Sequence, residues 1–136
     1  MKFNAVIAVM LFSIFISGGL YKTSQAEEKG KAPSITKAKG GYTVEELYIK
    51  KNQLDGKKVK VRGKVVKFNP NIMGKNWLHL QDGTGKPGTN DITVTTRQNA
   101  NLGGIVLVTG VVATNKDFGG GYRYEVMLDD AAIAAE

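Results

Sequence analysis

Two neighbouring runs of alternating residues within Val59–Gly85 constrain the fold of this chain more than any other feature. In the first run valines alternate with basic residues, which are Lys60, Arg62 and Lys64. In the second run leucines alternate with larger aromatic or polar residues, which are Trp77, His79 and Gln81. Because successive side chains of a strand point to opposite faces, each run is predicted as a strand with one face in a core. The opposite faces form a candidate binding surface.

Turn residues and the same alternation divide the rest of the chain into further strands. The five predicted strands are Lys57–Phe68, Trp77–Gln81, Asp91–Arg97, Gly104–Thr114 and Tyr122–Leu128. Asn69-Pro70-Asn71 and Gly74 are predicted to form the first turn, and Asp82 is predicted as a turn residue whose side chain bonds backbone N–H groups. Asp129–Glu136 is predicted as a short tail. Five short strands separated by turns predict an all-β fold, a small five-stranded barrel.

Glycines and a slip in the alternation indicate where the first and fourth strands bend. Two apolar residues adjoin at Val65-Val66, just after Gly63. A slip of this kind beside a glycine predicts a bulge or sharp bend, as a strand that serves both sides of a barrel needs. Gly110 permits a second bend in the fourth strand.

The N-terminal part of the chain divides into three segments. Residues 1–26 are predicted as a secretory signal peptide, because Lys2 precedes an apolar stretch and small residues end at Ala26. Polar residues 27–41 are predicted as a flexible leader to a domain of residues 42–136. That domain opens with a helix, Thr43–Asp55, in which Thr43 and Glu46 form a capping box. The protein is therefore expected in the periplasm or secreted, without membrane insertion after cleavage; a retained membrane anchor is the alternative.

Composition limits the classes of function. The chain has no Cys, one His and a formal net charge of +7, which favours acidic partners such as nucleic acid, glycans or an anionic membrane surface. A lysine-rich coat without a specific partner is the alternative. No pairing of a nucleophile with a base, and no pair of catalytic carboxylates, is indicated. We therefore expect a binding protein without enzymatic activity and without a resident cofactor.

Three segments resemble domains of the OB-fold: GKVVK at 63–67, WLHLQDGTG at 77–85 and VTGVV at 108–112. The pattern is similar to anticodon-binding-like OB domains and to small exported bacterial OB proteins labelled nucleic-acid binding. The resemblance implies ligand contacts from the second and third strands and their flanking loops, here Trp77, His79, Gln81, Thr93, Thr95, Arg97 and the loop around Phe118. One departure is that Gln98–Gly103 is too short for the helix that OB domains commonly place between strands three and four.

Basic and aromatic residues together suggest that the ligand is single-stranded nucleic acid or a similar polyanion. Such binding needs cations along the phosphates and flat rings under the bases. The candidate residues outside the second and third strands are Lys60, Arg62, Lys64, Phe118 and Arg123. The alternative is that these residues form a solvated basic face, with Trp77 packed against a loop, and do not bind nucleic acid.

Met73, Trp77 and His79 support an alternative ligand, a soft metal ion such as Cu(I) or Ag(I). Thioether and imidazole groups are suitable ligands for such ions, and a cation gains further from an indole ring. The set is similar in its ingredients to a small periplasmic copper-carrying OB protein. Against a metal, Met73 could simply fill the end of the barrel. A third hypothesis is that the same face docks a protein partner of the cell envelope.

Overall fold

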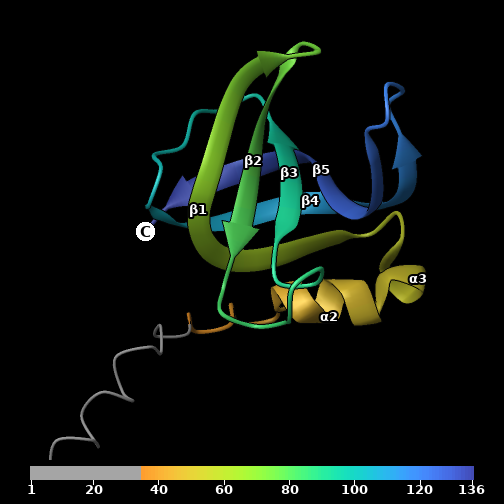
Figure 1. Cartoon of the computed structure of the whole chain (residues 1–136). Coiled ribbons are helices and arrows are strands. Elements are labelled where there is room, and N and C mark those ends of the chain that lie inside the picture. The colour runs from red at the N-terminus through yellow and green to blue at the C-terminus, as the bar shows by residue number, and fades with distance from the viewer. Residues whose placement is uncertain (1–34) are drawn as a thin grey trace, which may run out of the picture. The chain divides into compact units, whose positions relative to one another are not determined.

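The computed structural model describes residues 35–136, so the predicted signal peptide and most of the predicted leader lie outside the described residues. This part is all-β, with five strands and two short helices (Figure 1). The elements are α2 (Val44–Ile49), α3 (Lys51–Leu54), β1 (Lys58–Ile72), β2 (Lys75–Gln81), β3 (Ile92–Thr96), β4 (Ile105–Asp117) and β5 (Arg123–Ala135). Hydrogen-bonded neighbours form a closed ring in the order β1-β2-β3-β5-β4. Within the described residues, neither helix has the length and apolar character needed to cross a membrane.

Strand β1 serves two sides of this ring, and Figure 1 shows it curving strongly between them. Residues from Lys58 to Lys64 pair with β4, and residues from Lys64 to Ile72 pair with β2. The register of the second pairing shifts between Val65 and Lys67, which confirms the bulge predicted from the slip in alternation. Beyond the bulge the outward row changes from even-numbered to odd-numbered residues.

The core lies inside the ring and follows the predicted alternation. Its fully buried members include Val61, Val65, Leu78, Leu80 and Leu128. From the helix, Val44 and Leu47 also pack into this core. Apolar residues at every second strand position therefore meet in the interior, as the sequence pattern predicted.

Asp82 attaches the helix to the sheet. Its side chain is 2% exposed and accepts hydrogen bonds from the backbone N–H of Val44 (2.9 Å) and of Thr84 (3.1 Å). The predicted capping box is present, with Glu46 N–H donating to Thr43 Oγ1 and Thr43 N–H to Glu46 Oε1. The predicted turn role of Asp82 is confirmed, and the same carboxylate also holds the start of α2.

Several predicted boundaries are wrong, and the errors at the strands have a tertiary cause. The helix breaks at Lys50, whose φ of −103° and ψ of 16° separate α2 from α3. Of the residues predicted to form the first turn, 69–71 are part of β1, whereas Gly74 is at the reversal, where Met73 and Gly74 have φ of 52° and 79°. The predicted tail is the second half of β5, which pairs with β4 as far as Ala135. Ladder hydrogen bonds to a neighbouring strand outweigh local turn preferences at these positions.

The last residues of the predicted leader are packed on the domain. The backbone N–H of Ile35 donates to the carbonyl of Asp82 (3.2 Å), and Tyr42 N–H donates to the Lys60 carbonyl (2.9 Å). Ala38 is buried. Residues 35–41 therefore differ from the flexible segment that their polar composition predicts.

Candidate ligand-binding cleft

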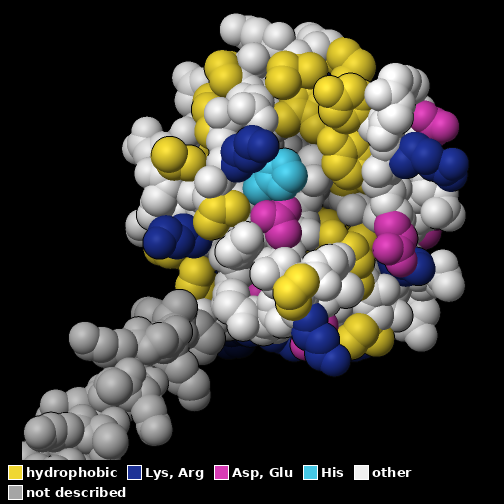
Figure 2. Space-filling view, in the orientation of Figure 1, with side chains coloured by type: hydrophobic (Ala, Val, Ile, Leu, Met, Phe, Trp, Pro, Cys, Tyr) yellow, Lys and Arg dark blue, Asp and Glu magenta, His cyan; other side chains and the backbone are white. Residues whose placement is uncertain are grey.

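A cleft of about 610 Å³ lies between the β1–β2 hairpin and the β4–β5 hairpin. Its lining residues are Lys67, Asn69, Ile72, Met73, Trp77, His79, Phe118, Gly119, Gly120, Tyr122 and Tyr124. Figure 2 shows hydrophobic side chains gathered near the histidine on this face. The cleft is therefore walled mainly by apolar and aromatic groups, as is usual for small-molecule sites.

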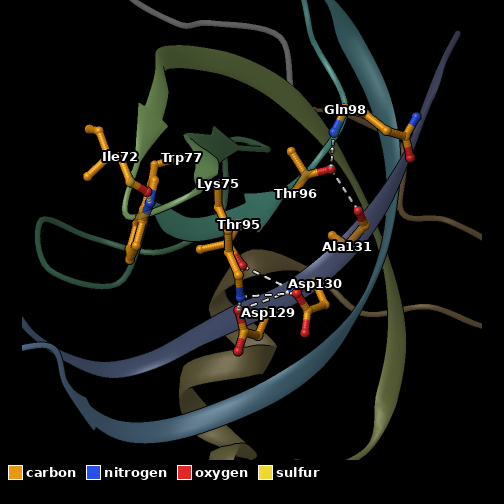
Figure 3. A network of polar contacts seen from close by, with 9 residues as sticks. All are labelled: Ile72, Lys75, Trp77, Thr95, Thr96, Gln98, Asp129, Asp130 and Ala131. Atoms are coloured by element: carbon orange, nitrogen blue, oxygen red, sulfur yellow. Dashed lines mark hydrogen bonds and ion pairs between the residues drawn. The ribbon is translucent and has the colours of Figure 1, made fainter.

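Three aromatic rings contact one another at the base of the cleft. The ring centroids of Trp77 and Phe118 are 5.1 Å apart and nearly perpendicular, and Tyr124 lies 5.9 Å from each. The Trp77 indole N–H donates to the Ile72 carbonyl (2.8 Å), a contact drawn in Figure 3. Trp77 is only 7% exposed, whereas Tyr122 at the rim is 61% exposed. Trp77 thus forms the floor, and the other rings supply the surface that a ligand can reach.

His79 is held in one orientation by Asp91. The distance from His79 Nδ1 to Asp91 Oδ1 is 2.6 Å, and the Gln81 amide donates to the other oxygen of the same carboxylate (3.2 Å). Burial alone would raise the pKa of Asp91, but the hydrogen bonds from His79 and Gln81 hold that pKa below its ordinary value. An ionised carboxylate only accepts, so Nδ1 carries the proton and Nε2 is the ring nitrogen left for a ligand.

Thr93 and Thr95 lie beneath the surface and do not line the cleft. Both are buried, and the Thr95 hydroxyl donates to Asp129 while it accepts from the Asp130 backbone N–H (3.0 Å). Lys75 pairs with both carboxylates, at 3.3 and 3.1 Å (Figure 3). Burial alone would raise the pKa of Asp129, but the Thr95 hydrogen bond and the Lys75 charge hold that pKa below its ordinary value. This network ties β2 and β3 to β5.

The predicted basic row is not at the cleft. Lys60 and Arg62 are on the segment of β1 that pairs with β4, and Lys64, where β1 passes from β4 to β2, is opposite Gln81; none of the three lines the cleft. Arg62 is engaged by Glu136, with Nε 2.6 Å from Oε1. Arg97 and Arg123 are exposed and do not line the cleft either. The structure therefore separates the predicted cations from the predicted aromatic residues.

Lys67 and Tyr124 line the cleft but were not among the predicted site residues. Lys67 is opposite His79, and Asn69 is opposite Trp77, in the β1–β2 ladder. The slip at Val65-Val66 was the signal that could have identified Lys67, because residues beyond it change faces. Lys116, on β4, adds a further cation, with Nζ 5.8 Å from the centre of the Phe118 ring.

All three residues of the alternative metal set line this one cleft: Met73, Trp77 and His79. The Met73 side chain is exposed at the hairpin turn. In the part of the chain that the structure covers, no group of three or more His, Cys, Asp or Glu residues is placed to hold a metal ion. A metal ion here would therefore depend on the thioether and the imidazole.

Neither a scan against protein-family models nor a search of curated proteins found a match for this chain. The side chains that line the cleft define the chemistry that it offers. Among the described residues its lining offers aromatic rings, one lysine, one histidine, one asparagine and one thioether, and it contains no carboxylate.

Proposed function

We propose that residues 42–136 form an OB-fold barrel and that the protein is a non-enzymatic binding protein whose ligand lies in the cleft. The ligand class proposed is single-stranded nucleic acid or another polyanion with flat rings. The five-stranded ring supports this proposal, and so does the place of the cleft, because OB domains bind ligands beside the loops that join strands one to two and four to five. Strand two also lines the cleft, whereas no residue of β3 does. Export by the N-terminal segment is part of the same proposal.

The observation that carries the proposal is the group of contacting rings Trp77, Phe118 and Tyr124 in a cleft that also contains Lys67. Bases stack on aromatic side chains whatever their sequence, and cations beside the rings attract the phosphates. Because Trp77 is nearly buried, Phe118 and Tyr124 are the rings proposed to stack.

A fluorescence titration with a single-stranded DNA oligonucleotide tests the stacking. Phe118→Ala and Tyr124→Ala should each weaken binding by about 1–3 kcal/mol, the typical loss for one stacked base. Lys67→Gln should reduce the steepness of the log–log salt dependence by about 0.7, the value for one phosphate contact on a single strand. Lys60→Gln is the matched control and should leave that slope unchanged, because Lys60 lies on the β4 side of β1.

A merely basic protein would behave differently in the same titration. In such a protein, Lys60→Gln and Lys67→Gln would reduce the salt dependence of binding by equal amounts. It would bind duplex DNA as tightly as single-stranded DNA, and Phe118→Ala would leave its affinity unchanged. Those results would refute the proposal. Export is tested separately by mass spectrometry of the periplasmic fraction. Cleavage after Ala26 predicts an intact protein whose mass corresponds to a chain that begins at Glu27.

A soft metal ion is the second candidate ligand, favoured by the position of Met73 and His79 on the same cleft. Asp91 fixes the His79 tautomer. In metal sites a carboxylate commonly does the same, by accepting a hydrogen bond from the histidine nitrogen that does not bind the metal. Anaerobic titration with Cu(I) should quench Trp77, the single tryptophan of the chain. Met73→Leu should abolish the quenching, and Met127→Leu, a buried site away from the cleft, should not. An unchanged Trp77 emission during the titration would exclude this candidate.

A further inference from the structure

The cleft offers few positive groups for a ligand. Among its described lining residues Lys67 is the one permanent cation, His79 is the one imidazole, and no carboxylate is present. Lys116 lies nearby against Phe118. Lys60 and Arg62 belong to the segment paired with β4, and Lys64, which is opposite Gln81 in the β1–β2 ladder, does not line the cleft. The site can therefore balance about one anionic group rather than a series of phosphates.

The walls of the cleft also limit the size of its ligand. Ile72 and Met73 bound it on one hairpin, and Phe118 and Tyr122 bound it on the other. Its volume of about 610 Å³ lies within the usual range for small-molecule sites, roughly 300–1,000 Å³. The space suits one ring system with its substituents.

The β1–β2 ladder places the polar and aromatic groups in a fixed order. Lys67 is directly opposite His79, and Asn69 is directly opposite Trp77. Side chains opposite each other on one face of an antiparallel pair lie close together, with Cβ atoms about 4.5–5.5 Å apart. With its Nδ1 bonded to Asp91, His79 leaves Nε2 for a ligand, and this nitrogen donates to an anion beside the Lys67 ammonium only when it also carries a proton. The Asn69–Trp77 pair is two residue pairs along the ladder from this anion position, and the Phe118 and Tyr124 rings that contact Trp77 would hold the flat ring of a ligand near the anion.

We propose that the cleft binds one flat ring that carries one anionic group, of the size of a nucleoside monophosphate, with the anion between Lys67 and His79. The inference rests on the proposed function, because it places one nucleotide unit of the proposed ligand in the same cleft. It adds that the binding unit is a single nucleotide and not a tract. Asp91 is a positioning residue for His79.

Ligand length tests this inference directly. Isothermal titration calorimetry would measure the affinity of the protein for each ligand in a series. The ligands are thymidine, thymidine 5′-monophosphate and 5′-phosphorylated oligothymidylates of two, four and eight nucleotides. The monophosphate should bind about tenfold or more tightly than thymidine, and the octamer should exceed the monophosphate by no more than the roughly eightfold statistical gain of repeated units. A gain of 100-fold or more with length would overturn the inference while supporting the proposed function. If none of these ligands bound, both would fail.

Matched variants separate the anion contact from the ring contact. Lys67→Gln and His79→Gln should each weaken monophosphate binding about tenfold and leave thymidine binding unchanged, whereas Phe118→Ala should weaken both ligands equally. Lys60→Gln should change neither. Asp91→Asn should act through His79, so its effect should vanish in the His79→Gln background. Equal losses for thymidine and its monophosphate in Lys67→Gln, in a variant with unchanged Tm, would overturn the assignment of the anion position.

Discussion

Gly63 offers the sharpest test of how β1 crosses the structure. A Cβ atom at this position would lie 2.6 Å from Leu80 Cγ and 3.0 Å from both Leu80 Cδ2 and the Gln81 carbonyl oxygen. Leu80 is fully buried in the core, so it cannot move away without disturbing its neighbours. The φ of Gly63 is not in the left-handed region, so the requirement for glycine is space and not an unusual backbone angle.

The expected cost of Gly63→Ala is that of overpacking a core, about 1–3 kcal/mol in the free energy of unfolding. In a domain of this size each kcal/mol lowers Tm by roughly 4–8 °C. Gly63→Val should cost more, because its two methyl groups enter the same space. Gly110→Ala serves as a comparison and should lose less stability than Gly63→Ala. A Cβ atom added at Gly110 would be 3.1 Å from its nearest neighbour, the Cβ of Ala131.

Thermal and urea denaturation followed by circular dichroism would measure these losses. A double-mutant cycle with Leu80→Ala identifies their origin, because removal of Leu80 Cγ removes the closest contact. The double variant should be more stable than the sum of the single losses predicts, by about 0.5–3 kcal/mol of coupling. An unchanged Tm for Gly63→Ala, or strictly additive losses, would refute the packing argument.

Two further predictions concern carboxylates, one buried and two partly exposed. Asp82→Ala leaves the buried Val44 N–H without its acceptor and frees the start of α2, so urea denaturation should show a loss of about 1–3 kcal/mol; a change under 0.5 kcal/mol would contradict this anchoring role. Asp91 and Asp129 have pKa values below the ordinary 3.8, so the folded state binds fewer protons than the unfolded state near that pH. Their stabilisation is present above about pH 3.8 and is lost as pH falls through the folded-state pKa values, which a urea midpoint measured from pH 6 to pH 2.5 should show. Asp129→Asn should make that fall smaller, and an equal fall in the variant would contradict the assignment.

Local patterns in the sequence determined much of the fold. The alternation of valines and leucines identified the core positions of β1 and β2, since period two is a property of each strand alone. The slip at Val65-Val66 located the bulge. The capping box of Thr43 and Glu46 located the start of α2, because both partners lie within one helical turn.

Only the tertiary structure decided which side chains share the cleft. Lys60 and Lys67 are both on β1, yet the first pairs with Thr109 of β4 and the second lines the cleft opposite His79 of β2. Likewise the segment after Leu128 has no strong strand signal of its own and is a strand because β4 pairs with it. An alternating pattern states which residues share a face of one strand, but the partner across the ladder depends on residues distant in the chain. The position of each cation relative to the aromatic rings is set by that long-range pairing.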